Sequence, residues 1–187
     1  MHKIMILCGL PVVLFACGSA PEQYPVKIEA ANQVKTDSLT QPVSVINPEG
    51  EINTGTTDPG KLVAYALTLK GTPYKYASAD PASGFDCSGF ITYVFNHFGI
   101  SVPRSSVDFT QQGKPTELRL AKPGDLILFT GTDSTIRTVG HMGIITRSGD
   151  STVFVHSTSG KAYGVTETTL NPYYMGRFVK VIRIFKE

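Results

Sequence analysis

The order of helix-like and strand-like segments is the feature that most limits how this chain can fold. Apolar residues recur at helical spacing over 59–71 and 87–98, and a third, short helix is expected over 105–112. Beyond Pro115 the pattern changes to short apolar runs separated by turn residues: 126–129, 141–146, 152–156 and 179–185. Helices first and strands afterwards favour an α+β fold, with N-terminal helices packed on a C-terminal antiparallel sheet, over a doubly wound parallel sheet.

The N-terminus resembles a bacterial export signal. Lys3 precedes a nearly continuous apolar run over 4–15, which is shorter than a membrane-spanning helix and has the length of a signal-peptide core. The run ends at Ala16 and Cys17, followed by small residues, and this resembles a lipobox. The alternative is an ordinary cleaved signal with a cysteine near the cut by chance.

Three segments are therefore expected. They are a lipoprotein signal peptide over 1–16, a lipidated Cys17 with a flexible tether over 17–57, and a folded domain over 58–187. The 187 residues are 41% hydrophobic and carry a net charge of +2, which suits one globular domain and gives no indication of a nucleic-acid surface.

The three cysteines differ in their expected fates. Cys8 leaves with the signal peptide and Cys17 is lipidated, so Cys87 is the only thiol of the mature chain. Exported proteins normally pair their cysteines, and a lone thiol is prone to oxidation, so Cys87 is expected to be retained for chemistry. The alternative is an inert, buried cysteine. Because Cys87 starts the helix over 87–98, the free N–H groups there are expected to lower its pKa and to stabilise a substrate oxyanion.

A thiol nucleophile needs a base, and four histidines are available. His2 lies in the export signal and His97 lies near the far end of the Cys87 helix. His141 and His156 lie in two strands that a tight turn joins. We expect His141 to be the base and His156 to orient it, although each could instead be a structural histidine.

Seven short pieces occur in order between Lys61 and Ile184: GTPY at Gly71–Tyr74, DCSGF at Asp86–Phe90, PRSS at Pro103–Ser106, KPGDLILF at Lys122–Phe129, GHMGI at Gly140–Ile144, FVHSTSGK at Phe154–Lys161 and NPYYMGRF at Asn171–Phe178. Together they resemble the NlpC/P60 cysteine peptidases, which are bacterial cell-wall hydrolases of papain-like fold. The chain is most similar to small lipoprotein members with a single catalytic domain.

The resemblance implies roles for individual residues. Cys87, His141 and His156 match the nucleophile, the base and the third polar residue of the family. Tyr74 matches a tyrosine beside the nucleophile and is expected to contact substrate or oxyanion. Asp86 and Ser88 match residues near the substrate amine, and the alternative for both is helix capping.

Two further residues or segments bear on the cleft. Arg104 is expected to be structural and to bridge the loop after the Cys87 helix. Family members often carry Gly-Gly shortly after the tyrosine, whereas this chain has Tyr74-Lys75-Tyr76-Ala77-Ser78-Ala79. The loop over the cleft is therefore expected to differ in shape, which affects specificity.

The resemblance implies a hydrolase that cleaves peptidoglycan stem peptides, either at the γ-D-glutamyl–diaminoacyl bond or at the diaminoacyl–D-Ala cross-link. It implies a monomer with no cofactor or metal, held by its lipid in the cell envelope, with the outer membrane as the expected site and the domain facing the periplasm or wall. Three alternatives stay open. They are a non-catalytic wall-binding or regulatory lipoprotein on the same fold, a zinc site formed by Cys87, His141 and His156, and a related thiol transferase or amidase.

Overall fold

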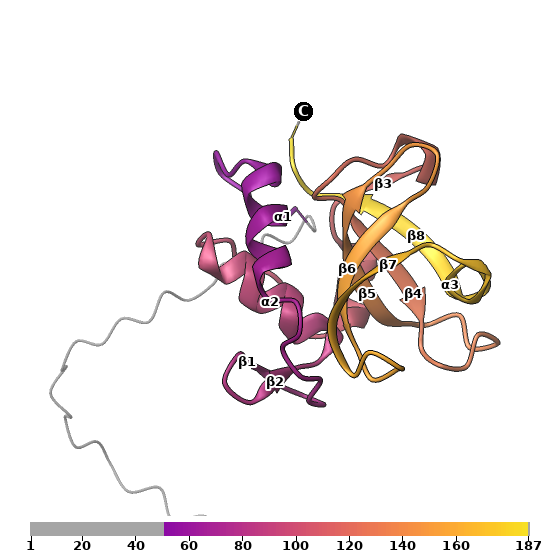
Figure 1. Ribbon diagram of the computed structural model, residues 1–187. Coiled ribbons are helices and arrows are strands. Elements are labelled where there is room, and N and C mark those ends of the chain that lie inside the picture. The colour runs from indigo at the N-terminus through magenta and orange to yellow at the C-terminus, as the bar shows by residue number, and fades with distance from the viewer. Residues whose placement is uncertain (1–50, 187) are drawn as a thin grey trace, which may run out of the picture. The chain divides into compact units, whose positions relative to one another are not determined.

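The computed structural model describes residues 51–186 (Figure 1). The expected signal peptide, the lipidation of Cys17 and most of the expected tether fall on residues 1–50 and lie outside the described residues. Within 51–186, no helix is both long enough and apolar enough to cross a membrane.

Two helices follow each other at the start of the domain. Helix α1 spans Pro59–Thr68 and begins at Asp58, whose carboxylate accepts hydrogen bonds from the N–H groups of Gly60 and Lys61. Helix α2 spans Cys87–His97 and buries one apolar face, including Phe90, Ile91 and Val94. Both helices agree with the predicted segments.

The remaining elements form one main sheet and short connections. The strands are β1 (Ala79–Asp80), β2 (Gly84–Phe85), β3 (Lys114–Thr116), β4 (Leu126–Thr130), β5 (Val139–Arg147), β6 (Val153–Thr158), β7 (Gly164–Thr169) and β8 (Phe178–Arg183). The 3₁₀-helices are η1 (Ser106–Gln111) and η2 (Leu118–Leu120), and the last helix is α3 (Pro172–Arg177).

The main sheet has six strands in the order β3-β8-β4-β5-β6-β7, and each neighbouring pair is antiparallel. It curls beside α1 and α2, while α3 lies on the far side of the sheet, beyond β4 and β8 (Figure 1). The expected α+β architecture, with N-terminal helices and an antiparallel sheet, is therefore confirmed.

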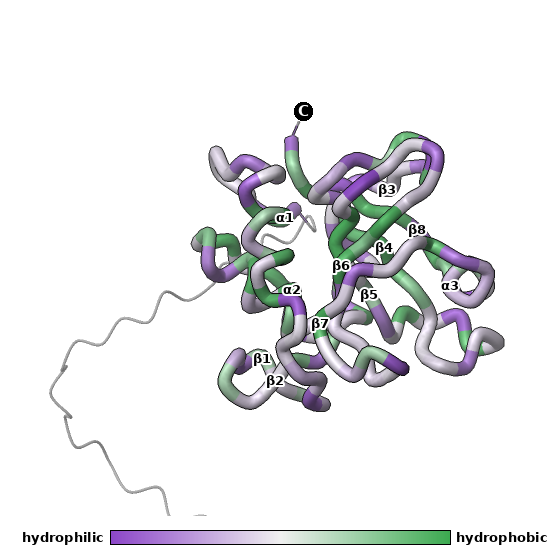
Figure 2. Tube along the Cα trace, in the orientation of Figure 1, coloured by the Kyte–Doolittle hydropathy of each residue, from purple (hydrophilic) through white to green (hydrophobic). Residues whose placement is uncertain are grey.

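Strand β4 has apolar clusters on both of its faces. Leu126 and Leu128 belong to the cluster that includes the buried residues of α1 and α2. Ile127 and Phe129 point the other way and pack with Tyr174 of α3. Because side chains alternate along a strand, a continuous apolar run is what burial on both faces requires. Figure 2 shows the apolar residues gathered along the inner strands.

The structure differs from the predicted boundaries at several places. The expected tether reached residue 57, but Ile52 is 5% exposed and belongs to the main core, so the packed part of the chain includes residues before Asp58. Strand β7 and helix α3 were not predicted. Strand β7 lies at the edge of the sheet and its sequence GVTETT is mostly polar, so it lacks the apolar run that marked the inner strands.

Candidate active site

The start of α2 is fixed by a carboxylate and by a glycine. Asp86 is the N-cap, and its Oδ1 accepts a hydrogen bond of 2.6 Å from the N–H of Gly89. Gly89 lies against the backbone of the loop before the helix, where a Cβ would collide with the carbonyl of Ser78. The same carbonyl accepts a hydrogen bond from the N–H of Asp86. The DCSG sequence therefore holds the first turn of α2 tightly against this loop.

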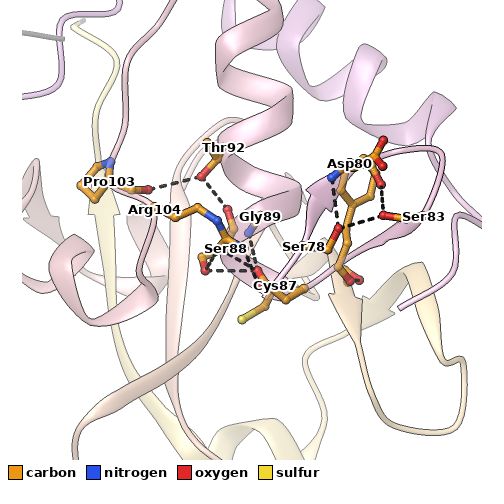
Figure 3. A network of polar contacts seen from close by, with 12 residues as sticks. Ser78, Asp80, Ser83, Cys87, Ser88, Gly89, Thr92, Pro103 and Arg104 are labelled. Carbon is orange, nitrogen blue, oxygen red and sulfur yellow. Dashed lines mark hydrogen bonds and ion pairs between the residues drawn. The ribbon is translucent and has the colours of Figure 1, made fainter. Parts of the chain in front are cut away.

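Arg104 completes the polar network around the helix start (Figure 3). Its Nη2 donates to Asp86 Oδ2 at 2.6 Å, and its Nη1 donates to Asp86 Oδ1 at 3.0 Å and to Ser88 Oγ at 3.1 Å. Such a forked pair orders the loop after α2 relative to the helix start. The expected structural role of Arg104 is consistent with this geometry, and the capping that was the alternative for Asp86 is observed.

Cys87 follows the N-cap, and its side chain points away from the polar network (Figure 3). Its Sγ lies 3.8 Å from the carbonyl oxygen of Gly140, at the start of β5, to which the thiol can donate a weak hydrogen bond. Gly140 lies close to Gly131. A Cβ added to Gly140 would lie only 2.8 Å from the Cα of Gly131, so a larger residue does not fit there.

The expected lowering of the Cys87 pKa is wrong for this structure, in which the pKa is raised overall. Burial is the main cause that raises the pKa of the thiol, and the negative charge of Asp86 adds to it. Backbone hydrogen bonds from Ser88, Cys87 and Met142 lower the pKa but do not overcome these two effects. Without substrate, Cys87 is therefore a neutral thiol at neutral pH.

The two strand histidines form a chain of hydrogen bonds that ends on a threonine. His141 Nε2 lies 2.8 Å from His156 Nδ1, and His156 Nε2 lies 2.9 Å from the hydroxyl of Thr168 on β7. The His141 ring packs near Phe129 and Tyr174, at centroid distances of 6.0 and 6.1 Å. These contacts leave His141 Nδ1 as the ring nitrogen available to a neighbour in the cleft.

Both histidines are held in the neutral form. Burial is the main cause that lowers the pKa of His141 well below its ordinary value, and electrostatic interactions with His156 and with the Arg177 cation lower it further. Burial and Arg177 lower the pKa of His156 to about 3. The resting pair is therefore a neutral thiol and a neutral imidazole.

The neutral chain can point in two directions. In one, His141 Nε2 donates to His156 Nδ1, His156 Nε2 donates to Thr168, and His141 Nδ1 is a free acceptor. In the other, Thr168 donates, and His141 carries its proton on Nδ1. Only the first direction leaves His141 able to accept a proton from a thiol.

Cys87 lies where two cavities meet. A large cavity of about 1120 Å³ is lined by Cys87 and His141, and by residues of the β6–β7 loop and α3. A smaller cavity of about 540 Å³ is lined by Cys87, Asp86 and Arg104. Tyr74 and Gly140 line both cavities. The cleft therefore extends to both sides of the thiol.

The predicted site residues do not all reach the cleft. Cys87, His141 and Tyr74 line the large cavity, whereas His156 is 0% exposed and lies behind that lining, hydrogen-bonded to His141 and Thr168. Burial is the main cause that raises the pKa of Tyr74, and the charge of Cys87 adds to it, as expected for a phenol near the sulfur. His97 is exposed and stacks on Tyr65 with 3.7 Å between ring centroids, away from the site.

The loop after Tyr74 keeps a glycine-like conformation without glycine. Ala77 has a φ of 57°, in the left-handed region that favours glycine. Ala77 and the exposed Tyr76 line the smaller cavity. The departure from the family pattern noted in the sequence therefore lies on the cleft wall.

Two residues of the site were not found from the sequence. Thr168 lies on the unpredicted edge strand β7, where a single threonine gives no sign of a histidine partner. Arg177 lies in the NPYYMGRF piece, yet its burial depends on α3 and on the end of β4, where it binds the carbonyls of Thr130 and Gly131. Among residues 51–186, no group of three or more His, Cys, Asp and Glu side chains is placed to hold a metal ion.

Comparisons with known proteins agree with this geometry. The sequence profile of the NlpC/P60 family matches residues 71–183. The chain is similar to the gamma-DL-glutamyl hydrolase of Bacillus subtilis, with 33% identity over 74% of this chain and 33% of that protein. It is also similar to a probable endopeptidase NlpC homolog of Haemophilus influenzae, with 25% identity over 95% of this chain and 94% of that protein.

A solved structure supports the fold match. The crystal structure of an NlpC/P60 family protein from Bacillus cereus superposes with a TM-score of 0.61 and 28% sequence identity, covering 71% of this chain and 42% of that one. The chain spans about a third or less of the length of the first curated relatives it matches, at 33% and 24%. With its profile match, its relatives and its fold in agreement, the chain belongs to the NlpC/P60 family, as the sequence predicted.

Proposed function

We propose that this protein is a thiol endopeptidase that hydrolyses an amide bond of peptidoglycan stem peptides. The observation that carries the proposal is the placement of a free thiol at the start of α2, in a cleft that it shares with His141. The far ring nitrogen of His141 is held by His156. A cleft on both sides of the thiol suits a substrate chain that continues beyond the cleaved bond in both directions.

In the first step Cys87 attacks the amide carbonyl. The thiol proton passes to His141 Nδ1, and the sulfur forms a bond to the carbonyl carbon. The backbone N–H groups at the start of α2, with the Tyr74 hydroxyl, stabilise the negative oxygen. The proton moves as the bond forms, because the resting thiol and imidazole are both neutral.

In the second step the carbon–nitrogen bond breaks, and His141 gives its proton to the leaving amine. This leaves a thioester on Cys87 and a neutral His141. A water then gives a proton to His141 and attacks the thioester, which releases a carboxylic acid and restores the thiol. His156 keeps His141 oriented throughout, and no metal or organic cofactor takes part in the proposed reaction.

The bond between γ-D-glutamate and the diamino acid is the first candidate, and the diaminoacyl–D-Ala cross-link is the second. The name of the Bacillus subtilis relative, a gamma-DL-glutamyl hydrolase, favours the first. Asp86 and Ser88 line the smaller cavity, where they are proposed to lie near an amine of the substrate other than the leaving amine. Arg104 already binds both side chains, so their larger contribution is to hold this wall in place.

Digestion of purified sacculi and defined muropeptides, with products identified by mass spectrometry, tests the proposal. Wild-type protein should release peptide fragments whose masses identify the bond, whereas Cys87→Ala and His141→Ala should release none. His97→Ala is the matched control, because this histidine is exposed and lies away from the cleft, and it should retain full activity. Equal cleavage by Cys87→Ala would rule out the thiol reaction. Binding to sacculi without cleavage by the wild type would support a wall-binding role instead.

We also propose that Cys17 carries the lipid that anchors the domain in the cell envelope, with the outer membrane as the expected site. The lipobox-like end of the apolar run supports this proposal. Metabolic labelling with a fatty-acid analogue should label the wild-type protein and leave Cys17→Ser unlabelled. Label on Cys17→Ser, or none on the wild type, would contradict the anchor.

A further inference from the structure

The two cavities that meet at Cys87 differ in charge. The smaller cavity is lined by two carboxylates, Asp86 and Asp108, together with Arg104. The large cavity is lined by Arg177 and Lys161, and among the described residues no carboxylate lines it. The large cavity therefore has the electrostatic character of a site for a negatively charged group.

Arg177 is the fixed cation of the large cavity. Its side chain is held by three neutral acceptors: Nε donates to the Gly131 carbonyl at 2.8 Å, Nη2 to the Thr130 carbonyl at 2.9 Å, and Nη1 to the Tyr173 hydroxyl at 2.8 Å. Its guanidinium carbon also lies 5.1 Å from the centroid of the Tyr173 ring. A guanidinium has five N–H donors, so two are left over after these contacts.

The charge of Arg177 has no anionic partner within residues 51–186, although the residue is only 7% exposed. Burying a cation is costly unless an opposite charge or several dipoles offset it. Carbonyl oxygens and aromatic faces offset part of this cost, but they leave a net positive charge on the cavity wall. A planar guanidinium in a fixed position matches a carboxylate in shape and charge.

The position of His141 shows which half of the substrate this wall faces. His141 lines the large cavity and is absent from the lining of the smaller one. In the proposed reaction His141 protonates the leaving amine, so the amine half of the substrate must lie on its side. In the γ-D-glutamyl–diaminoacyl bond, and in a cross-link that joins the D-Ala carbonyl to the side-chain amine of the diamino acid, the leaving amine belongs to the diamino acid. This residue bears a free carboxylate on its side chain when it is diaminopimelate, and none when it is lysine.

We propose that the large cavity selects stem peptides whose diamino acid carries a free side-chain carboxylate, which Arg177 binds with Lys161 at the rim. This inference rests on the proposed function and names its substrate class. Lys161 is exposed on the loop between β6 and β7, so its ammonium is free to approach the same carboxylate. Asn171, on the same wall, adds a neutral hydrogen-bonding group.

The test compares three synthetic stem peptides that differ only in the diamino acid: diaminopimelate, its side-chain carboxamide, and lysine. For the wild-type protein, kcat/KM should be about ten- to a hundredfold higher for the free carboxylate than for the other two, as expected for charge-assisted hydrogen bonds. Arg177→Gln should bring this ratio close to one, mainly by lowering kcat/KM for the free carboxylate. Lys161→Gln should reduce the ratio severalfold, and Lys75→Gln, an exposed lysine outside the cavity lining, should leave it unchanged.

The ratio of kcat/KM for the free carboxylate to kcat/KM for the other two peptides shows whether Arg177 recognises the substrate or only supports the structure. If Arg177 only holds Thr130 and Gly131 against α3, Arg177→Gln lowers kcat/KM equally for all three peptides, and this result would overturn the inference. Equal rates of the wild-type protein on the acid and the carboxamide would overturn it as well. If the Arg177→Gln protein does not fold, Lys161→Gln still tests the inference, because it should reduce the preference for the free carboxylate severalfold.

Binding to the Cys87→Ala protein tests the cavity independently of cleavage. Calorimetry should show tighter binding of the diaminopimelate peptide than of its carboxamide, and the difference should vanish in Cys87→Ala combined with Arg177→Gln. A wild type that cleaves none of the peptides, while Cys87→Ala still binds the acid preferentially, would refute the proposed function and keep the carboxylate site. Cleavage of all three peptides with no preference in binding would refute the carboxylate site and keep the function.

Discussion

Thr168 is expected to set the direction of the histidine chain, and Thr168→Val tests this. Valine keeps the shape of the side chain but removes the hydroxyl that lies 2.9 Å from His156 Nε2. The proton of His156 Nε2, present when His141 Nδ1 is free to act as base, then has no acceptor in the chain. The variant is expected to relax toward the opposite direction, in which His141 Nδ1 is already protonated.

The size of the effect follows from the burial of His156. The residue is 0% exposed, and the Thr168 hydroxyl is its partner at Nε2. An N–H group left without its partner in such a place costs about 1–2 kcal/mol. If this cost falls on the form in which His141 Nδ1 carries no proton and can act as base, kcat/KM falls by roughly five- to thirtyfold.

The assay is muropeptide hydrolysis combined with ¹⁵N NMR of the histidine rings. Thr168→Val should lower kcat with little change in KM and should move the Nδ1 resonance of His141 toward that of a protonated nitrogen. Thr168→Ser restores a hydroxyl and should recover most of the rate. Thr169→Val, an exposed position on the same strand, should behave like the wild type. Unchanged kcat and unchanged ring resonances in Thr168→Val would refute this reasoning.

Three further predictions concern pH and stability. Folded His156 has a pKa of about 3, whereas an unfolded histidine has a pKa of about 6.5, so between these values the unfolded state binds the extra proton. The contribution of neutral His156 to stability is therefore present above pH 6.5 and is lost as pH falls toward 3. Between pH 7 and 4.5, the free energy of unfolding in urea should therefore fall by about 2 kcal/mol less in His156→Gln than in the wild type. An equal fall in both proteins would contradict the lowered pKa of His156. Alkylation of Cys87 by iodoacetamide should keep accelerating from pH 7 past 9, because the thiolate reacts and its pKa is raised; a plateau between pH 5 and 7 would instead indicate a resting ion pair. Asp125→Ala should lower the free energy of unfolding by about 3 kcal/mol, because the buried carboxylate pairs with Arg183 at 2.9 Å, and a loss below 1 kcal/mol would contradict its structural role.

The sequence predicted the elements whose burial leaves a periodic pattern. Helices α1 and α2, and the inner strands β4, β5, β6 and β8, all appear where apolar spacing placed them. It did not predict β7 or α3, because an edge strand and a helix of six residues bury too little apolar surface to mark themselves. The missed site residues follow the same rule, since Thr168 lies on β7 and Arg177 lies on α3.

The pKa of Cys87 is where local reasoning from the sequence failed. A helix N-terminus stabilises a negative charge by roughly 0.3–1 kcal/mol when exposed, and the sequence alone places Cys87 at such a position. It does not reveal that the sulfur lies in a partly buried cleft beside Asp86, and removing an unpaired charge from water costs several kcal/mol. Burial therefore outweighs the helix, and the free enzyme carries a neutral thiol. Because the thiolate is the form that oxidises, a cysteine that ionises only as it reacts with substrate is protected between turnovers.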